Sequence, residues 1–190
     1  MKVKILLVSI LINQAIIAQV VPNSGFIYSK DFSKDIALYK AKAFVMKDVL
    51  NSTEEVVQFI VDPLATTSSK EIATLVYRCQ AKNKDGLLLG FYGDYMNDAG
   101  VVLQGFGFKN LPRVKAVGLL SLITRTIDEQ KDYLAKDPDN NNVYFQYDDL
   151  TILIYSSVET KIRIFWKSFD SEWNISAFRT TVKRFEKSLN

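Results

Sequence analysis

The spacing of hydrophobic residues divides the chain into helical and extended blocks. Between 34 and 50 the apolar residues recur at the three- to four-residue spacing of one helix face, at Leu38, Ala41, Val45 and Val49. From 55 to 108 the spacing falls to two, and β-branched and aromatic residues predominate, as in strands. We therefore expect a helix over 34–50, with Ser33 as its N-cap, followed by four strands over 55–63, 71–80, 86–96 and 100–108.

The segments between these strands have the composition of tight turns. "KNKDG" and "MNDAG" are rich in Gly, Asn and Asp, which tolerate a positive φ. Short connections of this kind join neighbouring antiparallel strands. The pattern therefore predicts an antiparallel meander.

In the second half of the chain, the spacing of the apolar residues again changes from that of a helix to that of strands. Apolar residues on one side of 111–135 predict a second helix, with Asn110 as its cap and Pro112 in its first turn. Three more strands are expected over 143–147, 150–156 and 161–167. A final helix is the clearest element, because its apolar residues are spaced three, four, three and four apart, at Ile175, Phe178, Val182, Phe185 and Leu189.

Blocks of strands separated by helices are typical of the α+β class. We expect the order α-ββββ-α-βββ-α, with three helices packed on one mostly antiparallel sheet of about five to seven strands. No internal repeat, low-complexity tract or long linker divides the sequence. Residues 19–190 are therefore expected to form a single domain, which at about 172 residues can build a good hydrophobic core.

The first 18 residues have the layout of a secretory signal peptide. Lys2 and Lys4 precede a strongly apolar run over 5–12, and "AIIAQ" offers a cleavage site after Ala18. The run is too short for a membrane-spanning helix, which needs about 20 apolar residues. We expect an exported protein, periplasmic or extracellular, that keeps no transmembrane anchor after cleavage.

The amino-acid composition excludes several types of catalytic site. The chain has no histidine, and Cys79 is its one cysteine, so a Ser–His–Asp triad, a Cys–His pair and an internal disulfide are excluded. Outside the signal segment 22 basic residues stand against 21 acidic ones, which gives no argument for nucleic acid. No nucleotide-binding glycine motif is present. We expect no cofactor.

The segment "FWKSFDSEWN" (165–174) allows two interpretations. Asp170 and Glu172 lie two residues apart between Trp166 and Trp173, which could form a carboxylate pair with stacking platforms for a glycan. Asp148 and Asp94 would be reserve carboxylates. The structural interpretation is simpler: Asn174 caps the final helix, and Trp173 and Phe178 form a hydrophobic staple across its start. We favour the structural interpretation.

Two further patterns have ligand-binding and structural interpretations. Oxygen-bearing residues fall at calcium-loop positions one, three, five and twelve, at Asp137, Asp139, Asn141 and Asp148. Asn142 replaces the usual glycine and a strand follows, so we interpret this segment as a polar turn and expect no metal. Aromatic residues among the glycines of 90–107, together with Trp166, could line a ligand groove, at Tyr92, Tyr95 and Phe106.

The basic row of the final helix, Arg179, Lys183 and Lys187, with Arg184 beside it, has the pattern of a solvated face. It could also meet an anionic membrane surface or an acidic partner. Together these features favour an exported binding or protein-interaction module, whose partner is another envelope or secreted protein or a small ligand. The alternative is a carboxylate-dependent enzyme that acts on a glycan.

Overall fold

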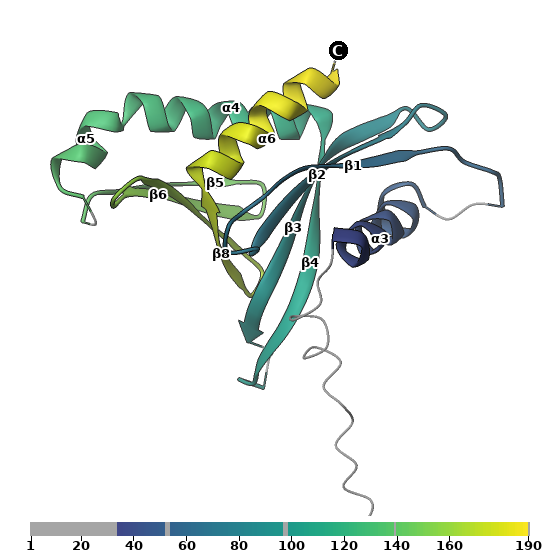
Figure 1. Ribbon diagram of the computed structural model, residues 1–190, viewed down its shortest axis with the longest axis horizontal. Coiled ribbons are helices and arrows are strands. Elements are labelled where there is room, and N and C mark those ends of the chain that lie inside the picture. The colour runs from purple at the N-terminus through teal and green to yellow at the C-terminus, as the bar shows by residue number, and fades with distance from the viewer. Residues whose placement is uncertain (1–33, 52–53, 97–98, 139, 190) are drawn as a thin grey trace, which may run out of the picture.

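The computed structural model describes residues 34–51, 54–96, 99–138 and 140–189 (Figure 1). Within these residues the chain forms two four-stranded antiparallel sheets and four α-helices. The α+β class is confirmed, but the prediction of one sheet with three helices is wrong. The predicted signal peptide and the Ser33 cap lie outside the described residues.

Each sheet is a meander whose strands follow one another in sequence order. The first sheet consists of β1 (Ile60–Thr66), β2 (Ile72–Cys79), β3 (Lys84–Met96) and β4 (Val102–Pro112). The second consists of β5 (Asn142–Tyr147), β6 (Leu150–Ser156), β7 (Thr160–Trp166) and β8 (Phe169–Asn174). A helix follows each sheet directly, α4 (Arg113–Glu129) after the first and α6 (Ile175–Leu189) after the second.

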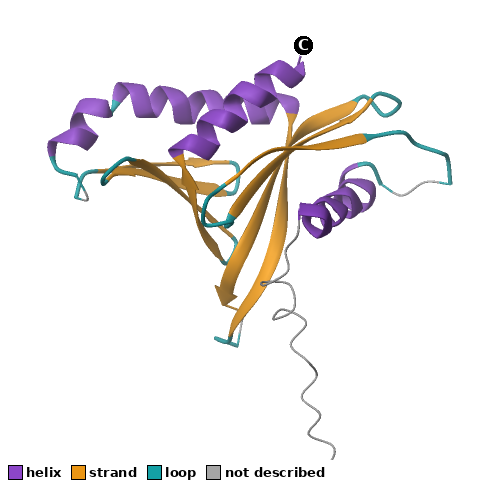
Figure 2. Cartoon of the chain, viewed as in Figure 1, coloured by secondary structure: helices purple, strands orange, loops and turns teal. Residues whose placement is uncertain are grey.

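Helices cover the first sheet on both faces (Figure 2). Helix α3 (Lys34–Phe44) and the π-helical turn Val45–Val49 lie on one face, where a small core contains Ala41, Val45, Leu88, Phe108 and the buried Cys79. On the other face lie α4, α6 and the second sheet, which meets the first along β3 and β8. The larger core of the protein fills this space, because the inward residues of both sheets and both helices converge there.

A glycine permits the close contact between the sheets. A Cβ on Gly107 of β4 would lie 2.9 Å from the indole of Trp166 and 3.1 Å from the ring of Phe169. Both aromatic rings also pack against Phe91 of β3, with centroid distances of 5.0 and 6.0 Å. Gly107 therefore marks a close approach of a side chain to the backbone, which is a common reason for glycine within a strand.

The element boundaries correct several expectations. Strand β8 was not predicted, and β1 begins at Ile60, later than the predicted 55. The predicted helix over 111–135 is two helices, because α4 ends at Glu129 and the short α5 (Lys131–Lys136) follows Gln130. Asn110 is not a cap: it lies within β4 and pairs with Leu88 of β3, and Pro112 occupies the N-cap position of α4.

Candidate functional site

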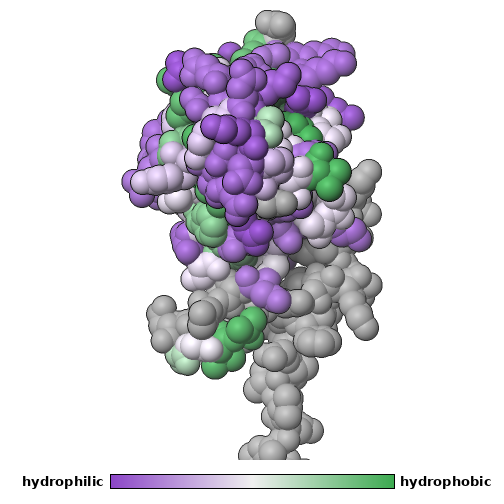
Figure 3. Space-filling view, turned by 90° about the vertical axis from the view of Figure 1, so that its left-hand side faces the viewer, coloured by the Kyte–Doolittle hydropathy of each residue, from purple (hydrophilic) through white to green (hydrophobic). Residues whose placement is uncertain are grey.

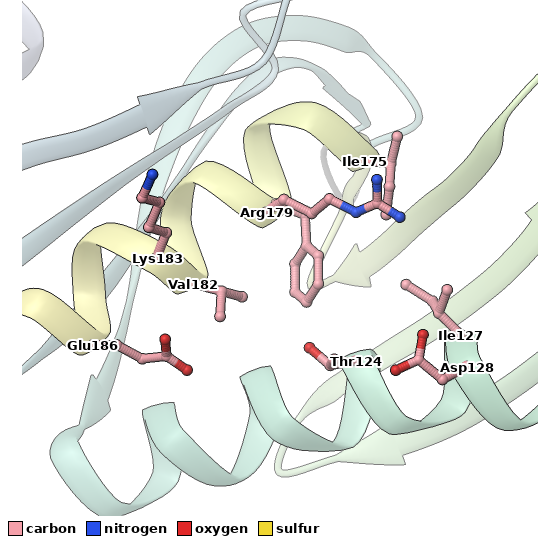
Figure 4. Close-up of a pocket in the computed structure, with 9 residues that line it drawn as sticks. Thr124, Ile127, Asp128, Ile175, Arg179, Val182, Lys183 and Glu186 are labelled. Carbon is pink, nitrogen blue, oxygen red and sulfur yellow. The ribbon is translucent and has the colours of Figure 1, made fainter.

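A groove runs between α4 and α6 (Figure 4). It consists of two overlapping hollows of about 180 and 420 Å³. In Figure 4 the side chains of Thr124, Val182 and Glu186 extend into the space between the helices. The apolar floor comes from both helices and is formed by Leu120, Ile127, Phe178, Val182, Phe185 and Leu189.

Buried polar contacts fix α6 on the first sheet and so define one wall of the groove. The hydroxyl of Thr181 lies 2.8 Å from that of Thr74 in β2, and Thr181 also donates to the carbonyl of Ala177. Arg184 donates to the Leu64 carbonyl of β1 at 2.5 Å. These contacts turn Thr181 towards the sheet and leave Val182 only half-buried, on the groove side.

Charged residues of both signs border the apolar floor. Arg179, Lys183 and Glu186 of α6 and Asp128 of α4 all line the smaller hollow. Within the described residues, none of these four side chains forms an ion pair of 4 Å or less, whereas Arg125, which lines the larger hollow, pairs with Glu129 at 3.9 Å. The rim can therefore offer cations to a bound partner without first breaking an internal ion pair.

Asp170 and Glu172 lie on one face of β8, as their spacing predicts, and each is paired with a cation of β7. Arg163 binds Asp170 through Nε at 2.5 Å and Nη2 at 3.1 Å, and Lys161 lies 3.3 Å from Glu172. The hydrogen bond that Arg163 donates to Asp170 raises the pKa of Arg163, and the hydrogen bond that Lys161 donates to Glu172 raises the pKa of Lys161. Neither carboxylate lines the α4–α6 groove.

The two tryptophans are on the opposite face of the second sheet from these acids. Trp166 and Trp173 are 4% and 0% exposed and belong to the main core. Trp173 contacts Phe178 edge-to-face at 5.1 Å, and Asn174 accepts a hydrogen bond from the Ala177 N–H at 2.8 Å. The predicted helix cap and hydrophobic staple are both present in the structure.

The other aromatic candidates are not gathered around Trp166. Tyr92 and Phe106 lie on the α3 side of the first sheet, where both rings contact Phe108 at 6.2 and 5.8 Å. Burial raises the pKa of Tyr92 well above 10, so its phenol stays protonated. The side chain of Tyr95 lies outside the described residues. The first sheet therefore separates Tyr92 and Phe106 from Trp166.

The calcium-loop positions are also dispersed. Strand β5 separates Asn141 from Asp148 by roughly 20 Å at the usual rise of an extended chain. Asp137 accepts a hydrogen bond from Asn140, and Asn141 donates to the Tyr133 carbonyl. Asp139 lies outside the described residues. Across the rest of the chain that the structure describes, no three acidic or thiol side chains are close enough to hold a metal ion.

Asp148 belongs to an ionic cluster that the sequence did not predict. Lys109 of β4 contacts both Asp148 and Asp149 in the β5–β6 turn, and Lys115 of α4 lies 2.9 Å from Asp148. Trp166 Nε1 donates to Asp149 at 2.9 Å. This cluster ties the turn of the second sheet to the end of the first sheet and the start of α4.

The charges of the cluster stabilise one another. Hydrogen bonds from Lys109 and Lys115 lower the pKa of Asp148. Partial burial would raise the pKa of Asp149, but the bonds from Lys109 and Trp166 outweigh it and lower that pKa. Because both carboxylates are matched by cations, the arrangement is suited to holding two elements together rather than to transferring a proton.

No family model, curated protein or solved structure matches the chain. In the described part of the chain, no helix is both long enough and apolar enough to cross a membrane.

Proposed function

We propose that this chain is an exported, non-catalytic binding module that holds an amphipathic segment of another envelope or secreted protein in the α4–α6 groove. The observation that carries the proposal is the groove itself, an apolar floor between two helices with Arg179 and Lys183 unpaired on its rim. Grooves of this form accept the apolar face of a partner helix in many peptide-recognition domains.

The rim indicates the chemistry of the partner. Two cations on one wall favour acidic residues beside the partner's apolar stripe, because complementary charges speed the encounter and fix the register. Asp128 on the facing wall would favour a basic residue on the other edge of the same segment. The preferred ligand is therefore an amphipathic segment with acidic residues towards α6.

The sequence of the amino terminus supports the proposal that the protein is exported. Lys2 and Lys4, the apolar run over 5–12 and Ala18 at the expected cleavage site are typical of a cleaved signal peptide, although Ile16 is larger than the residue usual at the third position before the cut. Mass spectrometry of the mature protein should find an amino terminus at or near Gln19. Recovery of the protein with Met1 intact would contradict this part of the proposal.

The surroundings of Asp170 and Glu172 favour binding over glycan hydrolysis. The catalytic carboxylates of a glycosidase flank the bond to be cleaved and must be free to reach it. Asp170 and Glu172 are instead each held in an ion pair on the sheet surface, Asp170 with Arg163 and Glu172 with Lys161. The tryptophans that would have been stacking platforms are buried on the other face.

The test of the groove is a comparison of variants of the tagged, mature protein in envelope extract. The groove variant combines Arg179→Glu and Lys183→Glu, both exposed positions. The matched control combines Lys131→Glu and Lys136→Glu, which reverse two exposed charges on α5. Quantitative mass spectrometry should find a protein captured by the wild type and the control but reduced about tenfold or more, roughly 1.4 kcal/mol in binding, with the groove variant. Equal recovery with all three proteins would contradict the proposal.

A further inference from the structure

The edge strands of the two sheets differ in how well they are protected against pairing with a strand of another chain. At the edge strand β8, the N–H of Glu172 donates to the Glu71 carboxylate at 2.7 Å, so the first sheet covers this edge. At the edge strand β1, Pro63 lacks an N–H, a register shift interrupts the ladder, and Arg184 binds the Leu64 carbonyl. Proline, irregular pairing and covering side chains are the usual means by which edge strands avoid pairing with other chains.

Edge strand β4 is also poorly suited to pairing with another chain. It contains Gly105 and Gly107, and glycine is depleted in strands. Lys109 of the same strand is held in the ionic cluster with Asp148 and Asp149. The lysine and the two glycines therefore make β4 a poor template for a further strand.

Strand β5 has none of these protections. Its sequence, NVYFQY, contains no charge, no proline and no glycine, and its register with β6 is continuous. Within the described residues no other element hydrogen-bonds to the outer edge of its backbone. Such a strand is an open template for a further strand.

The hairpin geometry shows which backbone groups point outward. Tyr147 pairs with Leu150 across a two-residue turn, and residues that flank such a turn form a hydrogen-bonded pair. Hydrogen-bonded pairs alternate along an antiparallel ladder, so Val143 and Phe145 also bind β6. The N–H and C=O groups of the alternate residues then face away from the sheet, at Asn142, Tyr144 and Gln146.

Burial also indicates that the second sheet is incomplete at this edge. Strands β6, β7 and β8 each contain fully buried residues, but in β5 the core-facing Val143, Phe145 and Tyr147 remain half-exposed. Tyr144 on the other face is 73% exposed. On the α5 side of the molecule hydrophobic residues lie scattered among hydrophilic ones (Figure 3), so backbone pairing rather than a broad apolar patch would direct association.

We propose that β5 pairs antiparallel with β5 of a second copy of the chain, about a two-fold axis at Tyr144. This register places Tyr144 opposite the partner's Tyr144 and Asn142 opposite the partner's Gln146, and it keeps each face of the sheet continuous. The outer faces of β5 and β6 carry no charged residue, while the ion pairs Arg163–Asp170 and Lys161–Glu172 lie on β7 and β8. Two copies therefore meet without like-charge repulsion at the seam, which favours self-pairing over a partner chosen by charge.

The interface joins two six-residue strands, which is at the small end of protein interfaces. The dimer is therefore reversible, and its proportion depends on concentration. The proposal does not depend on the α4–α6 groove, because the groove is formed by the helices and β5 lies at the edge of the second sheet.

Sedimentation velocity of the mature, full-length chain over a concentration series tests the association. The wild type should pass from monomer to dimer as concentration rises. Tyr144→Lys places a charge at the two-fold axis and should weaken the dimer at least tenfold, whereas Val158→Lys, at a residue that is 101% exposed in the β6–β7 turn, should not change it. A chain that stays monomeric into the millimolar range would overturn the proposal, and so would a dimer that Tyr144→Lys leaves unchanged.

Disulfide trapping in a Cys79→Ser background tests the register. Directly opposite residues in a hydrogen-bonded pair have Cα atoms about 5.5 Å apart, within the range of a disulfide. Tyr144→Cys should therefore cross-link to itself rapidly. Asn142→Cys and Gln146→Cys should each cross-link slowly alone and rapidly when the two proteins are mixed. Equal rates for Tyr144→Cys and Val158→Cys would show random collision and contradict the proposed pairing.

Discussion

The carboxylate of Glu71, which precedes β2 in the first sheet, accepts a hydrogen bond from the backbone N–H of Glu172 in the second sheet at 2.7 Å. The backbone carbonyl of Glu71 accepts another hydrogen bond, from Tyr92 in β3 at 2.8 Å. One residue therefore connects two strands of different sheets. Because it also covers the edge of β8, its loss affects both stability and edge protection.

Glu71→Ala should lower the free energy of unfolding by about 1–3 kcal/mol, because a partly buried N–H is left without its acceptor. Glu71→Gln should cost less, since its amide oxygen can still accept the bond. Glu54→Ala, at an exposed position, is the control. Urea denaturation of the four proteins measures the differences, and equal stability of the three variants would contradict the assigned bond.

Gly118 allows Tyr147 to lie against α4. A Cβ at residue 118 would collide with the Tyr147 hydroxyl, which donates to the Lys115 carbonyl at 2.9 Å. Gly118→Ala should therefore destabilise the wild type, although alanine favours a helix by about 1 kcal/mol. In a Tyr147→Phe background the same change should be neutral or stabilising. A double-mutant cycle measures this coupling, and additive effects would show that the two residues do not meet.

Asn174 is the N-cap of α6, through its 2.8 Å bond to the Ala177 N–H. Asn174→Ala should lower stability by about 1 kcal/mol, whereas Asn174→Asp should retain most of it, because aspartate also caps well. Thermal unfolding of both variants is the measurement. Similar losses for alanine and aspartate would place the role of Asn174 elsewhere, for example in its 3.0 Å bond to Ser68.

Trp173 and Asp170 should respond in opposite ways to truncation. Trp173 is 0% exposed, and Trp173→Ala should cost about 3–5 kcal/mol as a cavity opens in the main core. Asp170→Ala removes one half of a surface ion pair with Arg163 and should cost less than about 1 kcal/mol. Chemical denaturation gives both values. The glycan-enzyme interpretation predicts instead a hydrolytic activity that Asp170→Ala abolishes while the fold is retained.

The ionic cluster predicts a particular dependence of stability on pH. The folded-state pKa values of Asp148 and Asp149 are lowered, so at acidic pH the unfolded chain binds more protons than the folded one. The stabilisation is therefore present above the unfolded-state pKa of about 3.9 and is lost as pH falls through the lower folded-state pKa.

Asp148→Asn should reduce the melting temperature at pH 7, and the difference from wild type should shrink as pH falls from about 5 towards 2. Lys109→Gln removes the main cation and should flatten the same part of the curve. Melting temperatures across this pH range provide the test. A constant difference between wild type and Asp148→Asn would mean that the lysines do not hold the carboxylate in its ionised form.

The sequence alone determined the elements whose interactions are local. The spacing of Phe178, Val182 and Phe185 defined α6, and Asn174, Trp173 and Phe178 defined its cap and staple, because these contacts join residues at most five positions apart. The sequence also showed the apolar stripe of α6 and the basic row of Arg179, Lys183 and Lys187, but it indicated a solvated face and no groove.

Only the tertiary structure decided how the strands divide into two sheets and which residues line the groove between α4 and α6. A period of two shows which residues share a face, but pairing depends on backbone hydrogen bonds that carry no sequence signal of their own. Phe169, Ser171 and Trp173 alternate with Asp170 and Glu172 as in a strand. Strand β8 was nevertheless not predicted, because the cap at Asn174 indicated only the start of the final helix. The α4 wall of the groove, the bond between Glu71 and Glu172, and the cluster of Lys109 with Asp148 and Asp149 all join residues at least 39 positions apart, so only the folded chain brings them together.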